Sequence, residues 1–204
     1  MFSANDGQPA IHPGDVTAII LAAGLSQRHG PADKLLRNMD GKPLAMHIAD
    51  TLTKIPFTER ISVVASKNHE LAALFSERHY TVVVNPDPAH GQGHSLSLGV
   101  RKALEKRQPK ALLICLADMP FVSTEVIGSL IKALNTEATA VVCSTRGRIT
   151  PPALFGNIHF DDLARLEGDT GAKTLLHSIP ELLQLEVAPH YLRDFDTSKD
   201  FISP

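Results

Sequence analysis

The sequence predicts an α/β domain in which helices cover both faces of a mostly parallel sheet. Short apolar runs alternate with helical stretches, the runs are nearly continuous in apolar residues, and 43% of all residues are hydrophobic. Strands buried on both faces read as continuous apolar runs, whereas strands with one wet face alternate. The 204 residues suit one large domain. We expect residues 1–15 to be a disordered or extended lead-in and residues 16–204 to form a single domain.

The elements follow from these patterns. The predicted buried strands are Val16–Leu21, Ile61–Ala65, Thr81–Val84, Ala111–Leu116 and Ala140–Cys143. The predicted helices are Leu44–Lys54, His69–Arg78, Ser95–Lys106 and Thr124–Asn135. Strand–helix–strand repetition with right-handed crossovers brings the carboxyl ends of parallel strands to one edge, where ligands of open α/β sheets bind.

The pattern changes after Cys143. Residues 146–160 are rich in turn formers and predict an irregular segment or a β-hairpin. Residues 168–179 predict a short capped helix, Leu182–Val187 a late strand, and residues 194–201 a turn into a last short helix. No repeat or linker divides the chain, which favours one domain.

Composition excludes several classes of function. The net charge of −2 lacks the basic excess typical of nucleic-acid or membrane surfaces. No apolar run approaches the about 18 residues of a membrane span, and the N-terminus lacks the pattern of a signal peptide. Cys115 and Cys143 lie in apolar runs, which predicts buried thiols rather than a disulfide or metal site. We expect a cytoplasmic protein with small-molecule partners.

The first connection is unusually long. About 22 residues separate Leu21 from the helix near Leu44, whereas βα loops usually have about 2–6. It opens with small residues 22–24, where a backbone can approach a ligand closely. Arg28 and Lys34 could then hold a polyanion, although a solvated surface loop is the alternative. No P-loop or complete dinucleotide fingerprint occurs.

Two further places could carry chemistry. Ser95 is predicted to cap the helix after the loop 85–94, an N-terminus that would favour an anion. His90 and His94 are four apart, but a zinc site would need further ligands, so a loop or substrate-contacting role is favoured. Asp118 directly follows the fourth predicted strand, where it would either cap a helix or bind a magnesium ion that bridges phosphates.

These segments resemble, in order, the motifs of the MobA-like nucleotidyltransferases, whose signature is L-A-[AG]-G-x-S-x-R-M-G-x-x-K. The six matching segments begin at Leu21, Asn85, Leu116, Pro152, Gly168 and Asp194, and the resemblance spans roughly residues 16–201. The molybdenum cofactor cytidylyltransferases, or MocA-like proteins, are the closest subgroup. The resemblance implies a Rossmann-like sheet of the nucleotide-diphospho-sugar transferase type.

The resemblance also implies a Mg²⁺-dependent transfer of CMP from CTP to a phosphorylated acceptor, molybdopterin or the molybdenum cofactor, with release of pyrophosphate. A molybdoenzyme is a further implied partner. The implied catalytic residues are Arg28, Lys34 and Asp118. The implied nucleotide-binding residues are Leu21, Ala22, Ala23, Gly24, Arg28, Lys34, Gly91, Ser95 and Asp118. Asp118 and Asp196 would bind the metal, and Asp169 would contact the acceptor and cap the helix beside it. In the family, alanine at the position of Ala23 accompanies cytidine nucleotides.

Some residues depart from the family pattern. His29 replaces the usual methionine, Pro88 stands where an aromatic residue is frequent, and His90 stands where an acid is common. Residues 150–152 read Thr-Pro-Pro instead of the frequent Gly-His-Pro. The phosphate side of the site therefore looks conserved and the acceptor side altered. A sugar-1-phosphate or polyol-phosphate nucleotidyltransferase is one alternative function, and a non-catalytic nucleotide- or cofactor-binding accessory protein is another.

Overall fold

The computed structural model describes residues 11–24, 33–66, 68–105, 108–134, 139–180 and 182–196. Its centre is a seven-stranded sheet in the order β5-β4-β1-β6-β8-β7-β9. The strands are β1 (Val16–Ala22), β4 (Glu59–Ala65), β5 (Thr81–Asn85), β6 (Ala111–Leu116), β7 (Ala140–Thr145), β8 (Arg148–Gly156) and β9 (Leu182–Glu186). Neighbours are parallel except at β8, which is antiparallel to β6 and to β7. The predicted mostly parallel sheet is confirmed.

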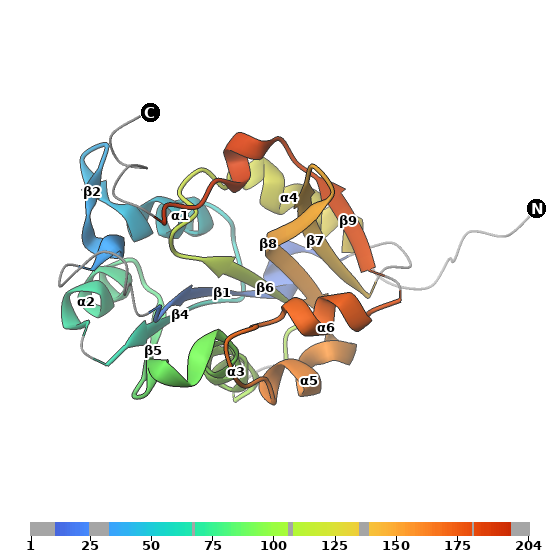
Figure 1. Cartoon of the computed structure of the whole chain (residues 1–204), viewed down its shortest axis with the longest axis horizontal. Coiled ribbons are helices and arrows are strands. Elements are labelled where there is room, and N and C mark those ends of the chain that lie inside the picture. Colours follow the sequence, from blue (N-terminus) through green and yellow to red (C-terminus); the bar gives the residue numbers. More distant parts are fainter. Residues whose placement is uncertain are drawn as a thin grey trace, which may run out of the picture.

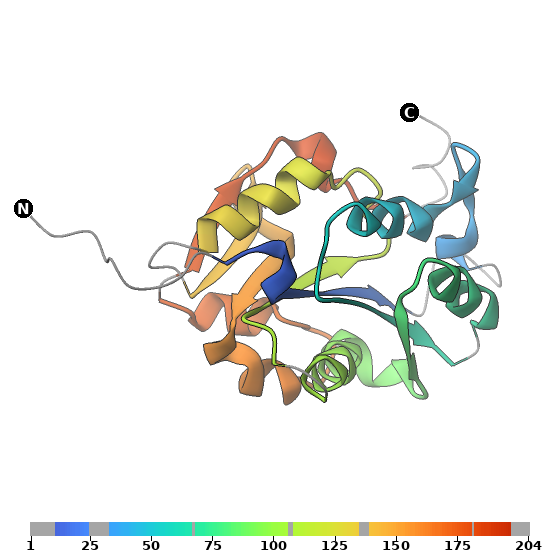
Figure 2. The same cartoon turned by 180° about the vertical axis from the view of Figure 1, so that it is seen from behind.

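Helices cover both faces of this sheet (Figure 1). One core cluster takes its helical residues from α1 (Leu44–Thr53), α2 (His69–Glu77) and α4 (Thr124–Leu134). The opposite cluster takes them from α3 (Gly91–Leu104), α5 (Phe160–Ala164) and α6 (Lys173–Ser178). Figure 2 shows the same two layers from behind. None of the helices in the described ranges is long and apolar enough to cross a membrane.

The continuous apolar run of β1 is explained by these two layers. Val16, Ala18 and Ile20 belong to one core cluster, whereas Ile19 and Leu21 belong to the other. Successive side chains of a strand point to opposite faces, so a strand covered on both faces needs an apolar residue at nearly every position. The predicted core thiols are confirmed as well: Cys115 and Cys143 are free and buried, and burial raises the pKa of Cys143 to about 12.

Residues 146–160 correct the sequence-based expectation. The β-hairpin is present, but its second strand, β8, runs through the main sheet between β6 and β7 instead of leaving it. Two prolines, Pro151 and Pro152, concealed this strand because proline cannot donate a ladder hydrogen bond. The sheet accommodates them with a register shift: Val142 pairs with Ala153, and Cys143 pairs with Thr150.

The structure corrects one further expectation and describes the segments of two others only in part. The helix predicted from Ser95 begins four residues earlier, at Gly91, so Ser95 cannot cap it. The described end of the chain, up to Asp196, contains the 3-10 helix η6 (Pro189–Leu192) and no α-helix beyond it, and residues 197–204 lie outside the described residues. The predicted lead-in is described only from Ile11, and Pro13–Asp15 within it forms a 3-10 helix, η1.

Candidate active site

Lys34 lies between two aspartates at the carboxyl end of the sheet. Its Nζ is 2.7 Å from Oδ2 of Asp118 and 2.8 Å from Oδ1 of Asp196. These residues come from the first long loop, the turn after β6 and the end of the described chain. The side chains of Lys34 and Asp118 are only 13% and 18% exposed. Two residues predicted from sequence to share a ligand are therefore in direct contact, although 84 positions separate them.

Local structure holds Lys34 in this position. The 3-10 helix η3 (Lys34–Leu36) begins after Asp33, whose Oδ1 accepts a hydrogen bond of 2.9 Å from the amide of Leu35. The other carboxylate oxygen of Asp33 accepts a hydrogen bond from the side-chain amide of Asn68. Leu35 is buried in the core beside α1. Capping on one side and burial on the other thus fix the start of the Lys34 side chain.

A buried phenylalanine holds the late acidic segment against Asp118. The amide of Phe195 donates a hydrogen bond of 3.1 Å to the carbonyl of Asp118. Its ring is buried, lies 5.7 Å from the ring of Phe121, and has the guanidinium of Arg193 5.0 Å above it. Asp194 and Asp196 flank this anchor, so both carboxyl groups are brought to the same corner. Sequence reasoning included Asp196 but missed Asp194, which the Asp-Phe-Asp spacing could have indicated.

We call Lys34, Asp118, Asp194 and Asp196 the acidic corner. Burial disfavours the charged form of Lys34, but the charges and hydrogen bonds of Asp118 and Asp196 outweigh it and raise the pKa of the lysine. Desolvation raises the pKa of Asp194, and the negative charges of Asp196 and Asp118 raise it further. Three carboxyl groups beside one ammonium leave an excess of negative charge. Such a corner attracts a further cation.

The residues of the acidic corner fit a divalent metal. Oδ1 of Asp118 is buried and has no hydrogen-bond partner in the described part of the chain. A buried carboxylate oxygen without a donor is costly, and it is the kind of ligand that Mg²⁺ and Mn²⁺ prefer. No group of three or more His, Cys, Asp or Glu among the described residues is arranged so that it could hold a metal ion by itself. The arrangement therefore suits an ion that takes its remaining ligands from water and substrate phosphates.

Further residues predicted to contact the nucleotide lie at the end of β1. β1 ends at Ala22, and Leu21, Ala22 and Ala23 are buried. No described atom lies within 4 Å of a Cβ added to Gly24. Arg28 lies outside the described residues, so its predicted role stays a prediction.

Gly91 and Asp169 meet at the start of α3. Gly91 has a φ of 92°, and a Cβ there would lie 2.4 Å from the backbone of Gly168 and 2.5 Å from Oδ1 of Asp169. The amide of Gly93 donates a hydrogen bond of 2.7 Å to the carbonyl of Gly168. The chain before α6 is thus docked on α3, as Figure 1 also shows. Asp169 does not cap α6, because the N-cap residue is Ala172 and no side chain bonds there.

Ser95 and the histidines of this region have local partners. The hydroxyl of Ser95 is buried and accepts a hydrogen bond of 2.9 Å from Nδ2 of Asn85, so it braces the end of β5 against α3. The rings of His90 and His94 are 5.5 Å apart, and Nδ1 of His90 lies 3.0 Å from a carboxylate oxygen of Asp87. A nucleotide contact by Ser95 stays a prediction.

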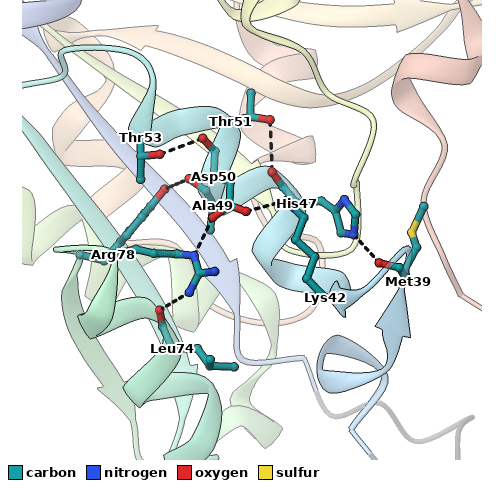
Figure 3. A network of polar contacts seen from close by, with 10 residues as sticks. Met39, Lys42, His47, Ala49, Asp50, Thr51, Thr53, Leu74 and Arg78 are labelled. Carbon is teal, nitrogen blue, oxygen red and sulfur yellow. Dashed lines mark hydrogen bonds and ion pairs between the residues drawn. The ribbon is translucent and has the colours of Figure 1, made fainter.

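A second ionic cluster provides a contrast (Figure 3). Asp50 on α1 faces two cations: Nζ of Lys42 lies 2.5 Å away and Nε of Arg78 lies 2.6 Å away. Burial disfavours the charged form of Asp50, but these two partners outweigh it and lower its pKa. Nε2 of His47 lies 2.9 Å from the carbonyl of Met39. This cluster joins α1, α2 and the hairpin β2 (Asn38–Met39) and β3 (Lys42–Pro43). Its carboxylate is neutralised, unlike those of the acidic corner.

Known proteins resemble this chain in both sequence and fold. The model of the MobA-like NTP transferase domain matches residues 18–185. The purine catabolism protein PucB of Bacillus subtilis is 34% identical over 169 residues, which cover 78% of this chain and 80% of PucB. A probable molybdenum cofactor guanylyltransferase of Pyrococcus horikoshii is 34% identical over 132 residues, which cover 63% of this chain and 61% of that protein.

Solved structures share the fold of this chain. Rv0371c of Mycobacterium tuberculosis superposes with a TM-score of 0.81 at 25% identity, covering 94% of this chain and 97% of that chain. A structure of Rv0371c in complex with manganese gives a TM-score of 0.75 at 23% identity, with coverage of 92% and 96%. The match of the family model over most of the chain decides the assignment. The chain belongs to the MobA-like NTP transferase family.

Proposed function

We propose that the protein transfers a nucleoside monophosphate from an NTP to a phosphorylated small molecule, with Mg²⁺ bound at the acidic corner. The observation that carries the proposal is the contact of Lys34 with Asp118 and Asp196, beside Oδ1 of Asp118, which has no hydrogen-bond partner among the described residues. A triphosphate would bring the negative charge that Lys34 needs in place of these carboxylates, and the metal would occupy the carboxylates that Lys34 leaves.

The reaction needs little proton transfer. A phosphate monoester is largely a dianion at pH 7, because its second pKa is about 6, so its oxygen attacks the α-phosphorus without a general base. The new phosphoanhydride bond forms as the bond between the α-phosphorus and the bridging oxygen breaks, and pyrophosphate leaves with the electron pair. Alignment and charge neutralisation therefore dominate catalysis.

Three residues of the corner have separate tasks in this scheme. Asp118 would hold the metal with its buried carboxylate, and Asp196 would supply a second carboxylate. Bound Mg²⁺ would neutralise phosphate charge and align the two substrates. The ammonium of Lys34 offsets the charge that builds on the leaving pyrophosphate, and Arg28 does the same with its guanidinium. The manganese complex of Rv0371c supports a divalent metal in this fold.

We propose CTP as the nucleotide and molybdopterin or the molybdenum cofactor as the acceptor. Ala23 supports CTP by its resemblance to the cytidylyltransferase pattern. Relatives named molybdenum cofactor guanylyltransferase favour GTP instead and support the same acceptor. Ala23 is 3% exposed and packs in the core cluster of α3, so any influence on the base would pass through the backbone rather than its methyl group.

Pyrophosphate release tests the proposal directly. Purified protein with Mg²⁺ is given each of the four NTPs, with and without molybdopterin, and then with a panel of sugar and polyol phosphates. We expect release with CTP that depends on both metal and molybdopterin. Release with GTP would reassign the base, and release with a polyol phosphate would reassign the acceptor. Nucleotide binding without any release would instead support an accessory protein.

A further inference from the structure

A pocket lies beside α6, and none of its lining residues belongs to the acidic corner. It has a volume of about 700 Å³ and lies between α6, the start of β8 and the strand β9. Its size falls within the about 300–1,000 Å³ that is typical of small-molecule sites. Ile149, Leu176 and Leu182 give it an apolar lining, and Arg148, Lys173 and His177 add basic groups. We call it the basic pocket.

Among the described residues, the ionisable side chains that line the basic pocket are all basic. No aspartate or glutamate is among the described residues that line it. No ion pair joins Arg148, Lys173 or His177 to a carboxylate in the described part of the chain. Lys173 and His177 are four residues apart on α6 and so lie on one face of the helix. Three basic side chains around an apolar lining suit an anionic ligand with an apolar or aromatic body.

Arg148 is held at the sheet edge by a tight hairpin. Arg146 and Gly147 both have positive φ, 51° and 74°, as the two-residue turn between β7 and β8 requires. The carboxylate of Glu186 accepts hydrogen bonds of 2.8 Å from the amide of Arg146 and from the hydroxyl of Ser144. Because β8 is antiparallel to β6, its first residue lies at the edge where β6 ends and Asp118 follows.

Lys173 is connected to the same edge of the sheet through the loop before α6. The loop before α6 bonds to α3 through Gly168 and Gly93, and Gly171 packs so closely on Gln92 that a Cβ there would lie 2.6 Å from its Oε1. The start of α3 itself follows the carboxyl end of β5. Both basic edges of the pocket are thus anchored to the sheet edge that carries the acidic corner.

We propose that the basic pocket binds the body of the acceptor and that this body carries negative charge of its own. This proposal depends on the proposed function, because only a transferase has an acceptor. In the proposed function the reacting phosphate would reach the acidic corner, whose residues would hold the metal, so this phosphate does not account for Lys173 and His177. A second anionic group on the acceptor would account for them. A neutral polyol or sugar body would leave these basic side chains without an anionic partner.

Direct binding tests the pocket without any turnover. The probes are pterin-6-carboxylate, an anionic aromatic molecule, and uncharged pterin, both followed by fluorescence without nucleotide. We expect saturable binding of the carboxylate and binding of pterin that is at least about tenfold weaker, since one charge-assisted hydrogen bond supplies that ratio. Lys173→Met with His177→Asn should abolish the difference. Lys102→Met, which removes a basic group on α3, should preserve it.

Kinetics then separates this proposal from the proposed function. In an enzyme that releases pyrophosphate, the double variant should raise the KM for the acceptor about tenfold or more and leave the KM for the NTP unchanged. An unchanged acceptor KM, or equal binding of the two probes by the wild type, overturns the pocket proposal while the function stands. Charge-selective binding without pyrophosphate release from any NTP has the opposite meaning: the pocket binds anions, and the proposed function fails.

Discussion

The acidic corner and the basic pocket carry opposite charge. In the corner, Lys34 pairs with Asp118 and Asp196, and the charges of these three residues act on Asp194. In the pocket, Arg148, Lys173 and His177 surround an apolar lining with no acid among its described residues. Two anionic substrates that react with each other would have to be neutralised separately before they approach. The two proposals rest on this difference: the corner would take a metal with a triphosphate, and the pocket would take the charged body of a second substrate.

The largest expected effect comes from removing the buried carboxylate of the corner. Asp118→Ala should lower turnover with Mg²⁺ and CTP by about 10²–10³ or more, because losing one electrostatic contact in a transition state typically costs that much. Steady-state pyrophosphate release measures it, and circular dichroism verifies the fold. Near-normal turnover in the variant would remove Asp118 from the metal site.

Two paired lysines allow a matched comparison within the chain. Lys34→Met should lower turnover by about 10², whereas Lys42→Met, which breaks the ion pair with Asp50, should leave turnover nearly unchanged. Without nucleotide, Lys34→Met should also bind Mn²⁺ at least as tightly as the wild type, because a competing ammonium is gone. Equal loss of activity in the two variants would mean that ion pairing alone, and not the position of Lys34, matters.

A substitution at Gly91 can weaken the packing of the loop before α6 on α3. Gly91→Ala should destabilise the protein by roughly 1–3 kcal/mol, since it adds a Cβ at positive φ against the backbone of Gly168. Gly128→Ala on α4 is the control, because a Cβ there meets no described atom within 4 Å, and it should stabilise by about 0.5–1 kcal/mol. Urea unfolding measures both. Similar stability of the two variants would contradict the close docking of the loop on α3.

The smallest expected effect concerns Asp194, which is disfavoured as a charged group first by burial and then by repulsion from Asp196 and Asp118. The pKa of Asp194 is raised in the folded state, so ionisation of this group opposes folding as the pH rises above its ordinary range near 3.8. Asp194→Asn should therefore slightly raise the melting temperature at pH 7 without metal and have no such effect below pH 3. Added Mg²⁺ should stabilise the wild type more than the variant. Greater stabilisation of the variant by Mg²⁺ would exclude repulsion as the origin.

Much of the fold was predictable because strand burial leaves a local trace. β1 and β6 are apolar at nearly every position, since both their faces meet helices. β8 left no such trace, because Pro151 and Pro152 interrupt it and its place depends on pairing with distant strands. The start of α3 was missed for a related reason. Glycines favour turns locally, yet Gly91 and Gly93 are needed where α3 contacts the loop at Gly168.

The site was predictable only as far as single segments reveal it. Lys34, Asp118 and Asp196 stand out through family-like motifs, and the structure brings them together. The anchoring by Phe195 and the position of Asp194 depend on a hydrogen bond to Asp118, from which they are far apart in sequence. The basic pocket combines Arg148 from the start of β8 with Lys173 from a short helix. Neither segment alone indicates that Arg148 and Lys173 line the same pocket.

Metal binding at the acidic corner tests the central claim most directly. Electron paramagnetic resonance can count bound Mn²⁺ in the wild type, Asp118→Ala and Asp50→Ala, each with a non-hydrolysable CTP analogue. The account predicts nucleotide-dependent binding of Mn²⁺ in the wild type and Asp50→Ala, and its loss in Asp118→Ala. Equal Mn²⁺ binding by all three proteins would contradict it.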